Sequence, residues 1–305
     1  MQLARPGAPF AAIVAATILA GCISSAAPSR SCDRTCLAAT LDSYLLALQS
    51  HDLAKTSLAP EFRATENGLA SRPGDGAAKT ITALGDIQRR YYDAATGQAA
   101  YLGTVREGDG SALIALRIRV EHGAISESEM LIARKGDALF SIEGFAADAP
   151  RPADPLPASD RVSRETMIAS AAAYFEGLAR HDGSLVPKIP GCERIENGTR
   201  VTNRTPRDAP ANAPAAEFGA TDCASGLERM TQIADVAHRR FPLVDEEAGV
   251  VMGVGLFLRP PGQTGNFAKR NLLVEFFETK GGKVSGIYAV MHYLEADAPD
   301  GTGWK

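Results

Sequence analysis

Two short motifs place an acidic side chain beside a turn signal. Residues 66–68 and 196–198 both read Glu-Asn-Gly. Asn and Gly readily adopt positive φ, so each motif predicts a tight turn, which leaves the Glu unexplained. A partly buried Glu beside a cavity can act as a general base, because burial raises its pKa. The candidate catalytic residues here are Glu66 and Glu196, and the adjacent candidate ligand-binding residues are Asn67 and Asn197.

Basic and aromatic side chains cluster at two further places, residues 89–92 (RRYY) and 238–240 (HRR). Guanidinium groups beside aromatic rings can hold a carboxylate or a phenolate. The candidate ligand-binding residues are therefore Arg90, Tyr92 and Arg240. Two structural alternatives stay open: solvated arginines at a helix C-terminus, or ion pairs between these arginines and the Glu of the two turn motifs.

Two polar residues near the C-terminus are four positions apart, Tyr288 and His292. Residues with this spacing share one face of an extended strand. If that face lines a cavity, both are candidate catalytic residues.

His-Asp pairs occur at residues 51–52 and 181–182. Each pair can serve as an acid–base couple, since His exchanges protons near neutral pH. Each can equally end one helix and cap the next. Their repetition favours the structural interpretation.

The N-terminus has the features of an export signal. Arg5 precedes an apolar run over residues 8–20, which is too short to span a bilayer. Residues 19–22 (LAGC) resemble a bacterial lipobox, which implies acylation of Cys22 and a lipid anchor. We expect a signal peptide over 1–21, a tether over 22–31, and a protein held at the bacterial cell envelope, facing the periplasm.

Cysteine usage is consistent with export. Besides Cys22 there are four cysteines, an even number that suggests disulfides in an oxidising compartment. We favour Cys32–Cys36 and Cys192–Cys223, while pairing between the two halves remains the alternative. A zinc site is less well supported, because no His pair or second close Cys pair is nearby. We expect no metal and no cofactor.

The composition excludes several classes of protein. Apolar residues make up 45% of the 305 residues, enough to form a core, so the chain is not largely disordered. The net charge of -4 and the single Trp argue against a nucleic-acid partner.

The chain contains an internal repeat. At a shift of 130 residues, eight of ten marker positions are identical, from Tyr44 and Tyr174 to Gly68 and Gly198. Such self-similarity indicates two copies of one structural unit. We expect a first domain over 32–145, a Pro-rich linker over 146–160 and a second domain over 161–305. Glu129 and Ala133 stand where the second copy has Tyr288 and His292, which hints that the second copy is the working one.

Each copy has the same expected order of elements. An amphipathic helix opens it, followed by a short turn region and the Glu-Asn-Gly motif. We expect another helix over 81–92 and its counterpart over 227–241. Strands follow, of which residues 112–120 show clear alternation and 250–258, 270–279 and 283–293 are the expected strands of the second copy. Helices followed by an antiparallel meander predict an α+β fold.

The pattern resembles the nuclear transport factor 2-like, or SnoaL-like, superfamily. The resemblance rests on the opening helix that ends in His51-Asp52 or His181-Asp182. Residues 32–52, the run to Gly68, residues 194–198 and the C-terminal Gly-Thr-Gly-Trp more closely resemble an uncharacterised tandem family of filamentous fungi and some bacteria. The resemblance implies two tandem cone-shaped domains, each with helices packed in a curved antiparallel sheet. It carries over no catalytic residue, since fold alone does not fix function.

Two functions follow as hypotheses. The first is a cofactor-independent lyase, isomerase or hydrolase that acts on a small apolar or aromatic compound in one cone. The second is a non-catalytic ligand-binding or envelope-interaction lipoprotein, whose cone would lack converging titratable groups. The sequence leaves open whether the protein is an enzyme, and its oligomeric state.

Overall fold

The structure is a computed structural model, and it describes residues 1–3, 7, 32–203, 219–295, 297–299 and 301–304. The chain divides into two compact units, Met1–Arg30 and Ser31–Lys305, and the second unit holds every helix and strand named below. The expected signal peptide, the tether and Cys22 fall almost entirely outside the described residues. Within the described part, no helix is long and apolar enough to cross a membrane.

The first repeat is a helix followed by a six-stranded mixed sheet. Its order in the sheet is β2-β1-β6-β5-β4-β3, with β1 and β6 parallel and the other pairs antiparallel. The elements are α1 (Arg34–Gln49), η1 (Leu53–Lys55), β1 (Leu58–Glu66), β2 (Leu69–Ser71), η2 (Gly76–Lys79), β3 (Ile81–Asp93), β4 (Gln98–Glu107), β5 (Gly110–Glu121) and β6 (Ala124–Ala133).

The second repeat has the same topology. Its sheet order is β8-β7-β12-β11-β10-β9, again with one parallel pair, β7 and β12. The elements are α3 (Arg164–Arg180), η4 (Gly183–Leu185), β7 (Lys188–Glu196), β8 (Thr199–Arg200), η7 (Leu227–Arg229), β9 (Asp235–Asp245), β10 (Val250–Leu258), η8 (Gly265–Ala268), β11 (Asn271–Lys280) and β12 (Lys283–Tyr293), and α2 (Ile142–Ala147) and η3 (Ala158–Asp160) lie between the repeats. The predicted α+β class with two tandem cone-shaped domains is confirmed.

One element type was predicted wrongly in both copies. Residues 81–92 and 227–241 were expected to be helical. Residues 81–92 instead lie in the edge strand β3, and residues 235–241 lie in the edge strand β9, whereas Leu227–Arg229 form the short helix η7. Neighbouring residues on β3 face opposite sides: Tyr91 packs between the sheets, whereas Tyr92 packs on the α1 side. This alternation has the period of a strand, and pairing with β4 and β10 overrides the weaker helical pattern.

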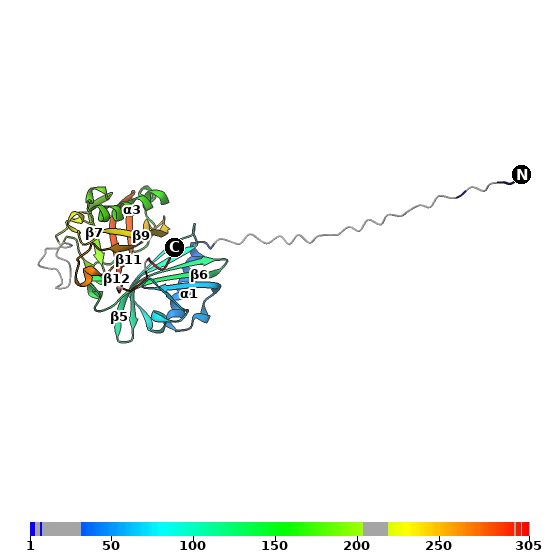
Figure 1. The fold of residues 1–305 in the computed structure, drawn as a ribbon, viewed down its shortest axis with the longest axis horizontal. Coiled ribbons are helices and arrows are strands. Elements are labelled where there is room, and N and C mark those ends of the chain that lie inside the picture. The colour runs from blue at the N-terminus through cyan, green and yellow to red at the C-terminus, as the bar shows by residue number, and fades with distance from the viewer. Residues whose placement is uncertain (4–6, 8–31, 204–218, 296, 300, 305) are drawn as a thin grey trace. The chain divides into compact units, whose positions relative to one another are not determined.

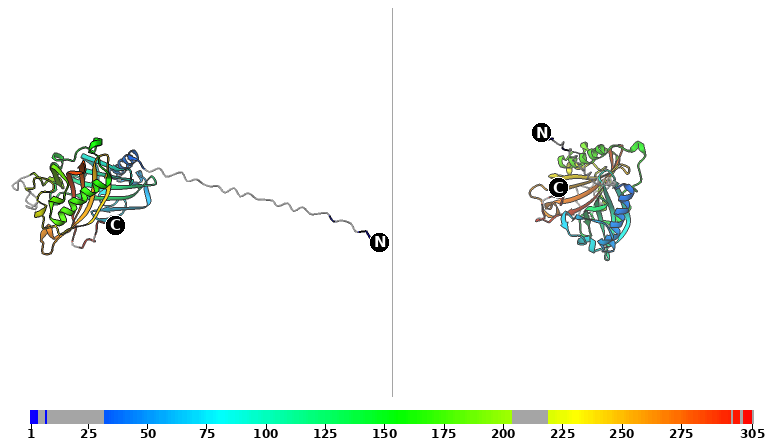
Figure 2. Two further views of the ribbon diagram at one scale, coloured as in Figure 1. Left: turned by 90° about the horizontal axis from the view of Figure 1, so that it is seen from above. Right: turned by 90° about the vertical axis from the view of Figure 1, so that its right-hand side faces the viewer.

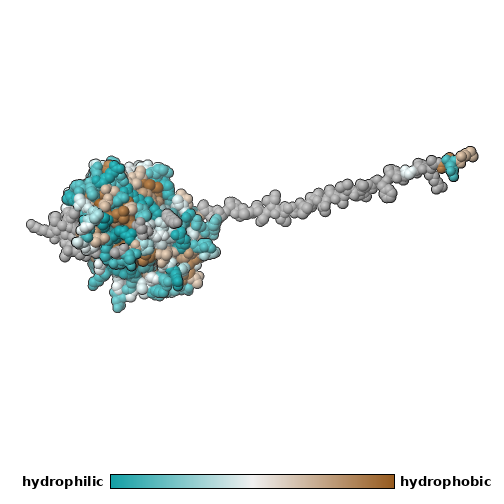
Figure 3. Space-filling model, viewed as in Figure 1, coloured by the Kyte–Doolittle hydropathy of each residue, from teal (hydrophilic) through white to brown (hydrophobic). Residues whose placement is uncertain are grey.

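Each long helix covers one face of its own sheet. Leu37, Leu41 and Leu45 of α1 pack on alternate residues of β5, such as Ile114 and Leu116. In the second repeat, α3 lies across its sheet in the same way (Figures 1 and 2). The visible surface mixes polar and apolar residues (Figure 3), and only a few large apolar side chains of the described residues are well exposed, among them Leu46 and Leu69.

The opposite faces of the two sheets pack against each other. Besides the cores under α1 and α3, a third apolar core lies between the sheets. It joins Tyr91, Leu102 and Leu113 of the first sheet to Leu256 and Phe276 of the second. The rings of Tyr91 and Phe276 lie 5.2 Å apart at their centroids. The two repeats therefore share one continuous apolar interior.

Two buried aspartates connect the repeats reciprocally. Asp245 at the end of β9 accepts hydrogen bonds from Arg34 Nη1 at 2.8 Å and from the backbone N–H of Tyr92 at 2.9 Å. Asp93 at the end of β3 accepts from Arg164 Nη1 at 2.9 Å and from the N–H of Val244 at 3.0 Å. Each repeat thus supplies the helix-start Arg for the other repeat's Asp, the pattern of a two-fold interface.

Both disulfides have the predicted pairing. Cys32–Cys36 spans the first turn of α1, and Cys192–Cys223 joins β7 to the segment that precedes η7. Both sulfurs of the second bond are buried in the core under α3. Closing this loop limits the conformations of the unfolded chain and so stabilises the fold.

The segment between the repeats docks on the second sheet through Glu278 of β11. The N–H of Arg151 donates to Glu278 Oε1 at 3.0 Å, and Arg89 Nε donates to the carbonyl of Pro150 at 2.8 Å. Burial raises the pKa of Glu278 from its ordinary 4.5 to about 7, despite the opposing charge of Arg151. The folded state therefore favours the protonated form of this carboxyl.

The raised pKa of Glu278 predicts a loss of stability with rising pH. Its contribution is complete below about pH 4.5 and declines as the pH rises through about 7. Glu278→Gln should remove about 2–3 kcal/mol of this decline, because Gln carries no proton to lose. Urea unfolding at pH 4.5, 6 and 8 measures it, with the exposed Glu228→Gln as control. The same pH slope in Glu278→Gln and wild type would contradict the prediction.

Candidate functional site

The interior of the second cone holds a row of acidic side chains. Register places Gly253, Glu275, Ala289 and Glu196 side by side on neighbouring strands β10, β11, β12 and β7. Glu275 and Glu196 are two strands apart, which puts their Cα atoms about 10 Å from each other. Their neighbours Leu273, Phe277 and Ala289 belong to the core under α3, so both carboxyls face the cone interior. We call Glu196 and Glu275 the carboxyl row.

A fully buried arginine accompanies the carboxyl row. Arg194 lies two residues before Glu196 on β7, on the same strand face, and is 0% exposed. Its Nε lies 2.8 Å from Glu196 Oε1, and its Nη1 donates to the hydroxyl of Tyr174 on α3 at 3.3 Å. The guanidinium orients Glu196 beside Tyr174.

Glu275 has a different environment. Burial, followed by the nearby Glu196, raises the pKa of Glu275 well above its ordinary value, while Arg194 opposes this effect only in part. Its Oε2 is buried and has no hydrogen-bond partner among the described residues. Burial therefore favours the neutral, protonated form of this side chain. Tyr174 is also buried, which raises its pKa well above 10.

A small cavity opens beside these groups. Its polar lining consists of Tyr174, Glu196, Arg259, Asn271 and Tyr293, and its apolar lining consists of Leu178, Met230, Ile233, Phe257 and Met291. Its free volume is about 10 Å³, close to the space that one water molecule needs. A larger ligand requires side chains to move, and the two methionines are flexible enough to do so.

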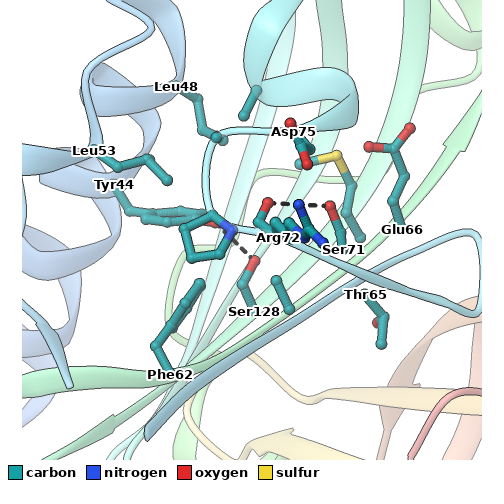
Figure 4. A pocket seen from close by; sticks show the side chains of 15 residues that line it. Tyr44, Leu48, Leu53, Phe62, Thr65, Glu66, Ser71, Arg72, Asp75 and Ser128 are labelled. Carbon is teal, nitrogen blue, oxygen red and sulfur yellow. Dashed lines mark hydrogen bonds between the residues drawn. The ribbon is translucent and has the colours of Figure 1, made fainter. Parts of the chain in front are cut away.

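The first cone lacks this arrangement. Ala64 occupies the position of Arg194, and Leu116 occupies that of Glu275, because both pairs have the same register within their sheets. Its own cavity, of about 30 Å³, is crossed by a hydrogen bond of 2.9 Å from Tyr44 to Ser128 (Figure 4). Among the described residues, only the second cone combines a buried cation with two interior carboxyls.

Glu66 and Glu196 occupy equivalent positions with different partners. Glu66 accepts a hydrogen bond from the N–H of Ala77 at 2.7 Å and lies 3.6 Å from Arg134. It lines the first cavity, as Figure 4 shows. The expected structural partners were Arg90 and Arg240, but the observed partners are Arg134 for Glu66 and Arg194 for Glu196.

Tyr288 and His292 do share a strand face, but it is not the cone interior. Tyr288 belongs to the core between the sheets, and Ile287, Ala289 and Met291 are the β12 residues that face the cone. His292 Nδ1 lies 3.7 Å from Asp137 of the loop after β6. Side chains alternate along β12, so the face that Tyr288 and His292 share does not line the cone. The condition for their predicted catalytic role is therefore not met.

The candidate arginines are separated by a register shift. Arg90 Nε donates to Asp42 of α1 at 2.8 Å, whereas Arg240 Nη2 reaches Glu129 of the first repeat at 2.5 Å. A β-bulge between Met252 and Val254 makes Arg240 the counterpart of Arg89. Tyr92 packs under the guanidinium of Arg34 at 4.9 Å. The structure brings none of these three candidates to the carboxyl row.

The turn asparagines extend the strands beside them. Asn67 and Asn197 have φ of 48° and 45°. The Oδ1 of Asn67 accepts from the N–H of Ile132 at 2.9 Å, and that of Asn197 accepts from the N–H of Met291 at 2.8 Å. These contacts explain why both copies need Asn at this point.

The two His-Asp pairs have equivalent contacts. His51 and His181 adopt positive φ after their helices, and each Nε2 lies 2.8 Å from a backbone carbonyl, of Ile81 and Ile233. Asp52 and Asp182 cap η1 and η4. This is the structural role that the repetition favoured.

Sequence reasoning missed Arg194, Tyr174 and Arg259 as members of the site. A signal for Arg194 was present, since it aligns with Ala64 at the shift of 130 residues and lies two residues before Glu196. A charge that appears in one copy at an apolar position requires a partner. In the described part of the chain no group of three or more His, Cys, Asp or Glu side chains could hold a metal ion.

The buried Arg194 predicts an asymmetry between the two equivalent glutamates. Glu196→Gln should lower the free energy of unfolding by about 3–5 kcal/mol, because it leaves a buried guanidinium without its carboxylate. Glu66→Gln should cost about 1 kcal/mol or less, since Arg134 is half-exposed and also pairs with Glu107. Urea denaturation of both variants measures the difference, and equal losses would contradict it.

One family model matches the part of the chain that contains the second repeat. Residues 160–291 match a domain of unknown function, DUF8021. No curated protein matches the chain significantly. Three solved structures are similar to part of it. A protein from Sphaerobacter thermophilus shows 14% identity and a TM-score of 0.28, over 42% of this chain and 95% of that one. A protein of unknown function with a cystatin-like fold from Methylobium petroleophilum PM1 shows 20% identity and a TM-score of 0.29, over 42% of this chain and 98% of that one. An NTF2-like protein from Burkholderia xenovorans LB400 shows 13% identity and a TM-score of 0.28, over 43% of this chain and 92% of that one.

Proposed function

We propose that the second cone binds a small apolar or aromatic molecule and moves a proton within it, as an isomerase or lyase that needs no cofactor. The observation that carries this proposal is the carboxyl row. Glu196 is paired with Arg194, whereas Glu275 is unpartnered at Oε2 and its burial raises its pKa well above the ordinary value. Two carboxyls whose environments separate their protonation states form an acid–base pair.

The proposed step balances within the site. Glu196 accepts a proton from a C–H bond of the ligand, and the electron pair of that bond shifts into the ligand. Glu275 donates its proton to the atom on which the negative charge develops. In an isomerisation Glu196 then gives its proton to a different carbon of the ligand, and Glu275 takes its proton back from the atom that it protonated. Both carboxyls regain their initial states, so no oxidant or reductant is required.

The walls of the site support the same function. Leu178, Met230, Ile233, Phe257 and Met291 exclude water, which strengthens the interaction of the carboxyls with a developing charge. A non-catalytic binding protein was expected to have a cone without converging titratable groups. Glu196 and Tyr174 line the cavity, and Glu275 lies in the same row of the cone interior, which favours the catalytic proposal.

Exchange of ligand hydrogen for deuterium tests this proposal. Small aromatic and terpenoid ketones and esters are incubated with the purified protein in D₂O, and NMR follows the loss of C–H signals. Glu196→Gln and Glu275→Gln should each slow exchange by about 100-fold or more, because each removes one proton-transfer group.

Glu66→Gln is the matched control and should exchange within about two-fold of wild type. Melting curves identify any variant that fails to fold. If no compound of the panel exchanges, or if exchange survives both substitutions in folded protein, the assignment of Glu196 and Glu275 is wrong.

We further propose that the protein is exported and anchored by an acylated Cys22 at the bacterial cell envelope, facing the periplasm. The sequence of residues 1–22 supports this proposal. The two disulfides also support it, since structural disulfides persist in oxidising compartments.

Lipid labelling tests the anchor. In a bacterial host, the full chain should incorporate radiolabelled palmitate and sediment with membranes. Cys22→Ala should abolish labelling and release the protein, because no other cysteine is available for acylation at the expected cleavage site. Labelling that persists in Cys22→Ala would exclude this anchor, and Cys192→Ala should leave labelling unchanged.

A further inference from the structure

The cavity of the second cone has a defined direction along the strands. Three interior rows follow one another: Glu275 with Ala289, then Leu273 with Met291, then Asn271 with Tyr293. Glu275 and Asn271 are four residues apart, or about 13 Å along β11. The carboxyl row therefore lies at one end of an apolar stretch, and the ends of strands β10, β11 and β12 lie at the other.

Arg259 lies at these strand ends. It follows the last residue of β10, and β10 ends where Phe257 pairs with Asn271. Its Nε donates to the carbonyl of Lys269 at 3.0 Å, and its Nη1 donates to the carbonyl of Gln232 at 3.1 Å. The rings of Phe257, Phe267 and Tyr293 lie 5.7–5.9 Å from the guanidinium carbon. Carbonyls and rings fix the position of this cation on the cavity wall.

The first repeat carries the opposite charge at the equivalent place. Glu107 lies nine residues after Gln98, as Arg259 lies nine residues after Val250, and Gln98 and Val250 pair with Asp93 and Asp245. Glu107 is bound by Arg134 at 2.6 Å. A cation at this position thus belongs to the second cone alone, together with Arg194 and Glu275.

From this placement we infer that the ligand of the second cone is a small monocarboxylate, whose carboxylate pairs with Arg259 and whose apolar body points at the carboxyl row. A guanidinium is the preferred partner for a carboxylate, and the apolar rows between require a hydrocarbon body. The row spacing suits a body of about five to eight carbons. This inference rests on the proposed function for its choice of cone, and it adds the substrate class and Arg259 as the residue that selects it.

Matched probes with and without the charge test the inference. Hexanoate and hexanamide differ in charge and hardly in shape. Isothermal titration calorimetry on the purified protein should show hexanoate binding at least ten-fold tighter than hexanamide at low ionic strength. Arg259→Gln should remove this preference, and Arg259→Lys should keep most of it. Glu107→Gln in the first repeat is the control and should leave both affinities unchanged.

Every outcome of this experiment decides the inference. Equal affinities in wild type, no binding of either probe, or an unchanged preference in folded Arg259→Gln would overturn it. The proposed function fails separately: Arg259-dependent binding of hexanoate without deuterium exchange of any carboxylate supports a carboxylate-binding protein and removes the enzyme. Exchange confined to neutral compounds would keep the enzyme and remove the carboxylate.

Discussion

The arrangement of the two repeats depends on two buried aspartates, Asp93 and Asp245, each of which accepts hydrogen bonds from the other repeat. Each carboxylate lies at the end of an edge strand and accepts from an Arg and a backbone N–H of the other repeat. Each Asp also accepts a hydrogen bond from a backbone N–H of its own repeat, but the Arg that pairs with it comes from the other repeat. A buried carboxylate is costly unless it is paired, so these contacts favour one orientation of the two repeats. That orientation brings the back faces of the sheets together and buries Tyr91 against Phe276. The polar and apolar contacts thus select the same geometry.

Packing at the back faces leaves the two cone interiors free to diverge. The first cone places Ala64 and Leu116 where the second has Arg194 and Glu275, so it has neither the buried cation nor the second carboxyl. Arg194 without Glu196 would be an uncompensated buried charge, and a carboxylate at Glu275 would be one of the opposite sign. Protonation of Glu275 resolves the second problem and creates a neutral acid inside the cone. The side chain that makes this cone unusual is also the one that costs most to bury.

The site and the fold use similar residue types for different ends. Glu278 and Glu275 lie three positions apart on β11, and burial raises the pKa of both. Glu278 faces the segment between the repeats and is bound by Arg151, whereas Glu275 faces the cone and has an unpartnered oxygen. Strand alternation alone assigns one to assembly and the other to the cavity. The same alternation moves Tyr288 and His292 away from the cone although they share a face as expected.

The amino-acid sequence by itself determined the repeat, the fold class and the opening helices, because identities at a constant shift and helical spacing are local or periodic signals. It favoured both disulfide pairings, and the structure decided between them and pairing across the two halves. It also singled out Glu196. It did not determine that residues 81–92 form an edge strand, since Tyr91 and Tyr92 acquire their burial only from a second sheet and from α1. Nor did it place Arg240 with Glu129, which depends on a β-bulge. Tertiary structure alone decided which carboxyls lie in one row of the cone interior, because Glu275 and Glu196 are 79 positions apart in the chain and come into that row through two strand registers and the parallel pairing of β7 with β12.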